Sequence, residues 1–150
     1  MGIARKAAEE VIAAFEAQDW VAVRSLAADG FTFSDPNSPN PPMDVDAWIA
    51  ANQGVYAAFS DFSFNFEVIE EEDNRAWVRS HITGTHDGDW DLSILGIGVI
   101  PATGKYVSTS ESITIGTVNA DGLVEKIEVA EQDETGGFIG ALRALGVNLG

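Results

Sequence analysis

Hydrophobic residues recur at helical spacing in four stretches of the chain. In the first, Val11 and Phe15 share one side of the helical wheel, and charged residues lie elsewhere on it. Asp19 is a good N-cap for a second helix, and Asp44 or Asp46 for a third. The predicted helices span residues 3–18, 20–28, 44–59 and 135–145.

After the third predicted helix the hydrophobic period changes to two, which is typical of strands. Phe62, Phe64 and Phe66 point one way, and the polar residues between them the other. The predicted strands span residues 31–35, 62–68, 75–85, 92–100, 106–118 and 123–133. This order predicts an α+β fold, in which the N-terminal helices pack on the concave face of a curved antiparallel or mixed sheet. The proline-rich segment 35–42 is expected to form a rim loop at a pocket mouth.

Length and charge narrow the possible functions. The chain has 150 residues, which predicts one domain over residues 1–150. Its net charge of −16 argues against nucleic-acid and membrane partners, because phosphate backbones and anionic lipids would be repelled. No signal sequence or long apolar run is visible, so a cytoplasmic location is expected. With no cysteine, disulfides and thiolate zinc sites are excluded.

Three segments carry a resemblance to a known family: Gly84-Thr-His-Asp-Gly88, Pro101-Ala-Thr-Gly-Lys105, and Asp121-Gly-Leu-Val-Glu125 followed by Asp133. With them the chain resembles the SnoaL-like polyketide cyclases over nearly its whole length. The resemblance implies the cone-shaped, cystatin-like α+β barrel of nuclear transport factor 2 and ketosteroid isomerase. It also implies a ring closure by intramolecular aldol condensation without a cofactor. By the same resemblance Asp133 matches the acid/base aspartate of the family, and His86 its Thr-His-x-Gly histidine.

Two carboxylates stand out on the last predicted strand. Ile127, Val129, Glu131 and Asp133 share one face at period two. If the aliphatic pair faces the cavity, Glu131 and Asp133 enter it too, and their pKa values should be pushed apart into a base and an acid. The alternative is that both lie in water at the end of the sheet.

The two histidines have opposite strand parity, so only one of His81 and His86 is expected to face the cavity. His86 either moves a proton or hydrogen-bonds the adjacent loop. Arg79 shares the His81 face and would pair with an acid such as Glu111, or with a substrate anion. With Asp35 and Asp133, Arg79 would instead resemble the water-activating site of limonene epoxide hydrolases.

Further pocket candidates are an acid and several aromatic residues. Glu111 lies within an apolar stripe, where it would pair with Arg79 or line the pocket. Phe33, Trp48, Tyr56 and Trp90 are expected in the core, with one or two shaping the cavity. Two histidines without a third ligand at suitable spacing make a poor zinc site, and no nucleotide-binding motif is present.

The sequence therefore predicts a cofactor-independent acid/base enzyme acting on a small, apolar, carbonyl-bearing substrate. Asp133 is the expected base and then acid, assisted by His86 or Glu131. Two alternatives remain: a hydrolase or dehydratase with a carboxylate-activated water, and a non-catalytic small-molecule-binding or interaction module of the same fold. A homodimer through the outer sheet face is also expected.

Overall fold

The computed structural model describes residues 2–35 and 41–147. Its helices are α1 (Ile3–Glu16), α2 (Trp20–Leu26), α3 (Val45–Ala58) and α4 (Gly137–Ala144), with a 3₁₀ turn at Ser93–Leu95. Its strands are β1 (Ala27–Ser34), β2 (Glu67–Glu72), β3 (Arg75–Ser80), β4 (Thr83–Thr85), β5 (Trp90–Leu92), β6 (Gly98–Ile100), β7 (Tyr106–Ser108), β8 (Ser112–Val118) and β9 (Val124–Gln132). Most of the predicted proline-rich loop falls on residues 36–40, which lie outside the described residues.

Side-chain carboxylates fix the starts of the three N-terminal helices. The Asp19 carboxylate accepts a hydrogen bond from the Ala22 amide at 3.1 Å, as predicted for α2. Of the two N-caps proposed for α3, Asp44 is the one observed: its carboxylate accepts a hydrogen bond from the Ala47 amide at 2.8 Å. For α1 the cap comes from β2, where Glu71 accepts hydrogen bonds from backbone amides at the start of the helix. The last cap is a tertiary contact, so it also fastens α1 to the sheet.

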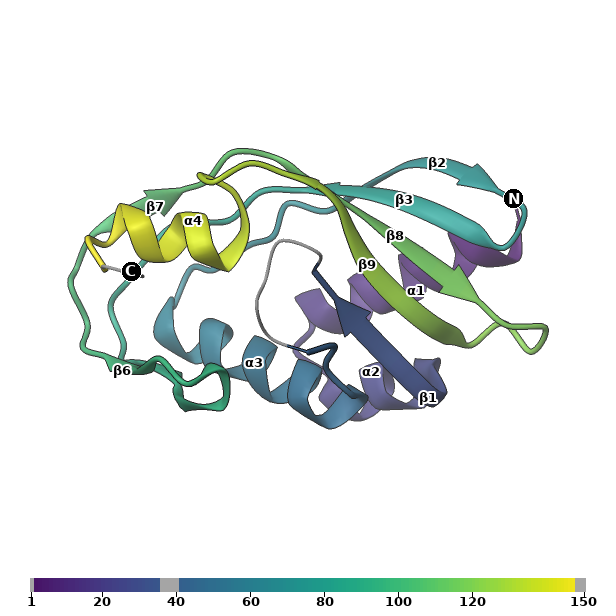
Figure 1. The fold of residues 1–150 in the computed structure, drawn as a ribbon, viewed down its shortest axis with the longest axis horizontal. Helices are drawn as coiled ribbons and strands as arrows, with labels where there is room; N and C mark the ends of the chain where they lie inside the picture. Colours follow the sequence, from purple (N-terminus) through teal and green to yellow (C-terminus); the bar gives the residue numbers. More distant parts are fainter. Residues whose placement is uncertain (1, 36–40, 148–150) are drawn as a thin grey trace.

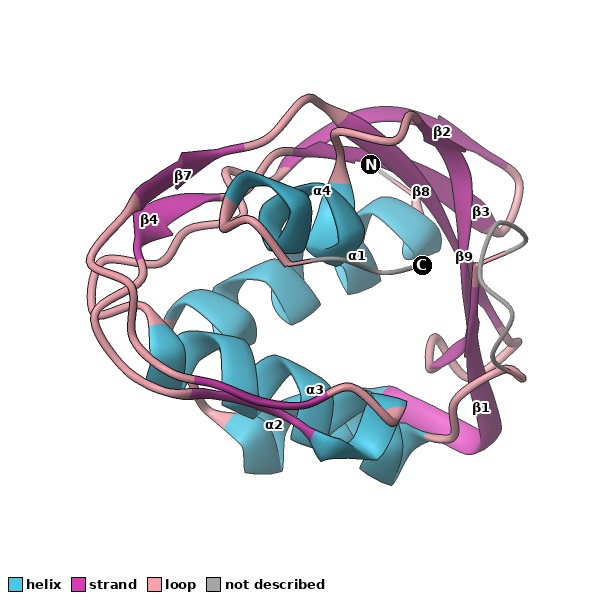
Figure 2. Ribbon diagram, turned by 60° about the vertical axis from the view of Figure 1, so that its left-hand side comes forward, coloured by secondary structure: helices cyan, strands magenta, loops and turns pink. Residues whose placement is uncertain are grey.

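The main sheet has five strands in the order β1-β9-β8-β3-β2. β1 runs parallel to β9, whereas the other neighbouring pairs are antiparallel. Figure 1 shows the long strands arching over α1, and Figure 2 shows α1 enclosed between the curved sheet and the other helices. The α+β prediction is confirmed, with a mixed sheet wrapped around its helices.

Two hydrophobic clusters hold the layers together. The first joins α1, α2 and α3 to the sheet around Phe15 and Trp48, whose rings lie 5.2 Å apart. The second lies under α4 and the β4–β7 pair, around Phe59, Trp90 and Leu142. Between the two clusters, side chains do not fill all of the space over the concave face of the sheet, and a cavity remains.

Several predicted strands are interrupted. Residues 92–100 form a short hairpin, β5 and β6, instead of one strand, and Gly96 makes its turn at φ +75°. Predicted strand 75–85 ends at Ser80 and resumes at Thr83, and predicted strand 106–118 is broken between Ser108 and Ser112. These breaks matter for the site, because each one changes which side chains face inward.

Candidate functional site

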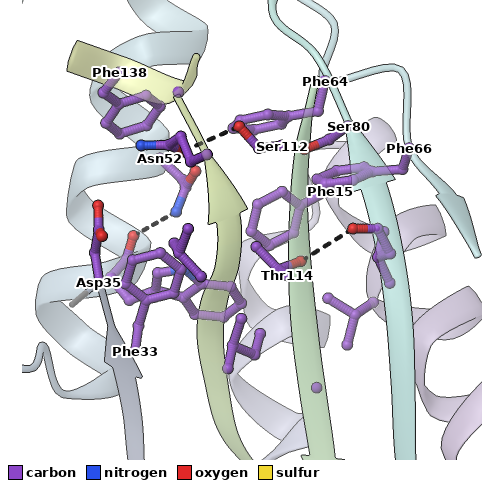
Figure 3. Close-up of a pocket in the computed structure, with 18 of the residues that line it drawn as sticks. Phe15, Phe33, Asp35, Asn52, Phe64, Phe66, Ser80, Ser112, Thr114 and Phe138 are labelled. Carbon is purple, nitrogen blue, oxygen red and sulfur yellow. Dashed lines mark hydrogen bonds between the residues drawn. The ribbon is translucent and has the colours of Figure 1, made fainter. Parts of the chain in front are cut away.

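A cavity of about 260 Å³ lies between the concave face of the sheet and helices α1, α3 and α4. Its walls are mainly aromatic and aliphatic, as Figure 3 shows. The aromatic rings on these walls belong to Phe15, Phe33, Trp48, Phe64, Phe66 and Phe138. A cavity of about 150 Å³ already takes up benzene, so this one suits a ligand of about two fused rings.

A few polar groups interrupt the apolar walls. These are the side chains of Asp35, Asn52, Ser80, His81, Thr109, Ser112, Thr114 and Gln132. Among the described residues of the lining, Asp35 and His81 are the two with acidic or basic side chains. They reach the cavity from the ends of β1 and β3, which are separated by β9 and β8 in the sheet. A ligand that contacts both must therefore extend across the sheet.

Asn52 is a buried amide, with 5 % of its surface exposed. Its Nδ2 donates a hydrogen bond to the Trp48 carbonyl oxygen at 2.8 Å, one turn earlier in α3. A carbonyl oxygen only accepts, so this bond fixes the orientation of the amide. The Oδ1 atom is then the acceptor that Asn52 offers toward the cavity.

Glu131 and Asp133 lie outside the cavity, contrary to the expectation from strand parity. In the pairing of β8 with β9, Ile113 opposes Glu131 and Thr114 opposes Val129, so Ala130 is an extra residue on β9. Such a bulge reverses the alternation of side chains beyond it. As a result Gln132, not Glu131, follows Val129 into the cavity.

Asp133 is exposed, and one of its carboxylate oxygens is engaged in a turn. Its Oδ1 accepts hydrogen bonds from Ser110 Oγ at 2.6 Å, from the Thr135 amide at 2.9 Å and from Thr135 Oγ1 at 2.7 Å. The Ser110 hydroxyl is the largest cause that lowers the pKa of this carboxyl, followed by Thr135. A buried base would show the opposite shift, so this environment is that of a structural turn residue.

Arg79 and Glu111 also lie outside the cavity. Regular alternation along β3 turns Ser80 inward and Arg79 outward, and the break after β3 places His81 in the lining as well. After the break at residues 109–111, Ser112 faces inward instead of Glu111. Arg79 bonds to Glu67, and its Nε lies 3.4 Å from Glu111 Oε2. The pairing of Arg79 with Glu111 was one of the expected alternatives, and these exposed ion pairs tie β2 and β3 to the residue before β8.

One of the two histidines, His81, lines the cavity, and the other, His86, is completely buried elsewhere. Strand parity does not explain this division, because the predicted strand is broken at residues 81–82. His86 Nδ1 lies 2.9 Å from Thr103 Oγ1 and accepts a 3.3 Å hydrogen bond from the Thr103 amide. Burial lowers the pKa of His86, against the opposing effect of the Asp87 and Asp89 carboxylates. Its ring packs against Phe59, with the centroids 5.2 Å apart.

The predicted aromatic candidates are also divided. The structure places Phe33 and Trp48 in the lining of the cavity. Trp90 is fully buried in the second cluster. Tyr56 packs against Trp20 and Phe62 to one side, where burial, with a smaller effect of Glu16, raises the pKa of its hydroxyl to about 12.

Comparison with known proteins identifies the family and supports the fold. Residues 5–134 match the family model of the SnoaL-like polyketide cyclases. The chain belongs to that family. No curated protein matches significantly.

Among solved structures, the SnoaL-like chain is similar to AclR from Streptomyces galilaeus, with a TM-score of 0.70 and 20 % identity over 95 % of this chain and 80 % of that one. It is similar to TsrD from Streptomyces laurentii, with a TM-score of 0.69 and 23 % identity over 97 % and 96 %. It is also similar to IdmH from Streptomyces antibioticus, with a TM-score of 0.68 and 21 % identity over 95 % and 98 %. At these identities the likeness establishes the cone-shaped fold.

Two of the three segments that carry the family resemblance, Gly84–Gly88 and Pro101–Lys105, are joined by hydrogen bonds. The His86 amide donates to the Lys105 carbonyl oxygen at 2.8 Å, and the Gly104 amide donates to the His86 carbonyl oxygen at 2.7 Å. With the Thr103 contacts, these bonds join the end of β4 to the segment before β7. In this SnoaL-like chain the motif histidine therefore holds two strands together.

No helix within residues 2–35 and 41–147 has the length and hydropathy of a bilayer-crossing segment. The same residues contain no cluster of three or more His, Asp or Glu side chains that could hold a metal ion.

Proposed function

We propose that this SnoaL-like protein is a cofactor-independent enzyme that transfers protons on a small, apolar, carbonyl-bearing substrate, as a polyketide cyclase or isomerase does. The observation that supports the proposal is a titratable pair, Asp35 and His81, on the walls of an otherwise aromatic and aliphatic cavity. Such a cavity takes up a flat ring system, and two proton-transferring groups are what enolisation next to a carbonyl requires.

The roles follow from the placement of the two side chains. An imidazole nitrogen can accept a proton, so His81 is the proposed base that removes a proton from the carbon next to the carbonyl. Asp35 lies on the other side of β9 and β8 and would contact the far end of the ligand. Asp133, His86 and Glu131 were expected to perform this chemistry, but their distance from the cavity lining favours Asp35 and His81.

The hydrolase alternative receives less support from the geometry. It requires two carboxylates and Arg79 around one water. Arg79 is engaged with Glu67 and Glu111, and Asp35 is the carboxylate among the described residues of the lining. A non-catalytic binding module remains the competing function, and an activity measurement separates it from the enzyme.

The test is deuterium exchange at the carbons next to the carbonyl of 2-tetralone, followed by proton NMR in D₂O with no cofactor or metal added. The protein should accelerate exchange above the buffer rate. His81→Asn should lower the acceleration about 100-fold, the lower range for loss of a general base, and Asp35→Asn should lower it less.

Glu131→Gln is the matched control, because it removes a carboxylate on the same sheet outside the cavity, and it should leave the rate unchanged. Exchange at the buffer rate with a ligand bound would favour the binding module. Loss of exchange in Asp133→Asn, with His81→Asn fully active, would show that the roles assigned here are wrong.

A further inference from the structure

The bulge on β9 brings one amide side chain, Gln132, into the cavity where parity had placed a carboxylate. Residues 126–129 alternate regularly, and Ala130 is the extra residue that reverses the faces beyond them. Gln132 is half-buried at the last position of β9, next to the turn that leads into α4. A backbone irregularity that aims a side chain at a cavity suggests a role for that side chain.

Two glycines make room for this amide. A Cβ atom at Gly137 would collide with the Gln132 side-chain amide, starting with Oε1, and Gly137 also has a positive φ of +62°. A Cβ atom at Gly136 would lie 3.0 Å from Ser112 Oγ and 3.2 Å from Gln132 Cγ. The Gly-Gly pair at the start of α4 therefore accommodates Gln132 and Ser112.

A neighbouring hydroxyl orients the amide. Ser112 Oγ, on β8, donates a hydrogen bond to Gln132 Oε1 at 3.0 Å, and Figure 3 shows Ser112 projecting into the cavity. With Oε1 engaged in this way, the Nε2 group remains as the donor of Gln132, and no hydrogen bond to a described residue occupies it. The end of the cavity at α4 thus presents a fixed, uncharged hydrogen-bond donor.

The charge of the lining defines what this donor would bind. No Lys or Arg is among the described residues of the lining, and the chain as a whole carries −16. An anionic ligand would meet repulsion and no counter-ion. A neutral oxygen acceptor, such as a ketone, would find a partner in the Gln132 amide.

We propose that Gln132 binds the carbonyl oxygen of a neutral ketone substrate and keeps that hydrogen bond as negative charge develops on the oxygen during enolisation. Ser112 and the glycine pair are positioning elements for it. This inference rests on the proposed function for the identity of the ligand atom. Preorganised amide donors of this kind stabilise enolate and other oxyanion charge.

The test compares 2-tetralone with tetralin, which has the same rings and no carbonyl, by isothermal titration. Gln132→Met should weaken binding of the ketone roughly 3- to 10-fold, the equivalent of one hydrogen bond, and leave tetralin within twofold. Gly137→Ala should reproduce this loss by displacing the amide. Gln53→Met makes the same chemical change on the exposed side of α3 and should have no effect.

The carbonyl stretching frequency of the bound ketone distinguishes a hydrogen bond from Gln132 to the ketone from a purely structural role of Gln132. The frequency should rise from wild type to Gln132→Met, because a hydrogen bond to the oxygen weakens the C=O bond. Equal losses for both ligands, or an unchanged frequency in a folded Gln132→Met protein, would overturn the assignment.

The two proposals fail separately. If exchange depends on His81 while Gln132→Met binds both ligands normally, the assignment of Gln132 is wrong and the proposed function stands. If no exchange occurs but Gln132 still discriminates ketone from tetralin, Gln132 binds the carbonyl oxygen as assigned, and both the enzymatic function and the role of Gln132 in enolisation are wrong.

Discussion

His86 shows how burial decides the role of one side chain. It is part of the motif that carries the family resemblance, and its ring is completely buried against Phe59 and Thr103. Burial disfavours the imidazolium ion, which is why the pKa of His86 is lowered. The folded protein therefore holds His86 in its neutral form, and protonation of this buried ring would destabilise the fold.

The pH dependence of stability follows from that lowered pKa. Below about pH 6.5 the unfolded chain binds a proton at this histidine while the folded protein does not. The free energy of unfolding should therefore fall as the pH decreases from about 6.5 toward the folded pKa, with a contribution of up to about 1.4 kcal/mol per pH unit. Urea titrations across this range would measure the slope.

His86→Gln is the comparison for this slope. The variant is expected to be less stable at pH 8, because the Thr103 contacts and the ring packing are lost, but to depend less on pH between 5 and 7. His81 remains in both proteins and serves as the internal control. Parallel stability curves for the two proteins would contradict a neutral, buried His86.

At the scale of elements, the start of helix α4 is held by hydrogen bonds between the turn before it and the segment before β8. Asp133 accepts hydrogen bonds from both Ser110 and Thr135, and the Ser110 amide donates to the Thr135 carbonyl oxygen at 3.2 Å. These bonds tie the segment before β8 to the turn before α4. Helix α4 in turn carries Phe138, one wall of the cavity.

Asp133→Ala should loosen this helix. Amide hydrogen exchange of residues 137–144 should become faster than in wild type, and the midpoint of thermal unfolding should drop by several degrees. Glu134→Ala is the matched control: it removes an adjacent acid whose 3.2 Å ion pair with Arg143 is exposed, so little stability should be lost. Equal effects of the two substitutions would show that Asp133 does not hold α4.

For the whole molecule, the outer face of the sheet is the surface that the helices leave uncovered. Trp77 and Ile115 are direct neighbours across β3 and β8, on the side opposite the cavity, and Arg75 stacks over the Trp77 ring at 5.1 Å. A homodimer through this face is a prediction from the sequence. The net charge of −16 per chain would oppose association at low ionic strength.

Sedimentation velocity would test the dimer. We expect wild type to associate, more strongly at high salt, where the repulsion between the two chains is screened. Ile115→Glu should give a monomer, since a two-fold axis would bring the new charges of both copies together. Val21→Glu, at an exposed position of α2, is the control. A wild-type monomer at high protein and salt concentrations would contradict the prediction.

The sequence by itself determined the features that depend on neighbours along the chain. Helical spacing located α1 and α3, and the capping preferences of Asp19 and Asp44 gave the starts of α2 and α3. The motifs around His86 and Lys105 identified the family, and hence the fold. The sequence also placed Asp35 and His81 among the candidates of a site that the structure now shows to be lined by both.

Only the tertiary structure decided which residues face the cavity. Counting by two along a strand assumes an unbroken pleat, and one extra residue at Ala130 exchanged Glu131 for Gln132 at the cavity wall. The break after β3 likewise separated Arg79 from His81. The Gly136–Gly137 pair is visible in the sequence, but its reason, the room that it leaves for the Gln132 side chain, appears only in the folded structure. The bulge at Ala130 is a feature of how β9 pairs with β8, and the hydrophobic pattern of β9 alone does not contain it.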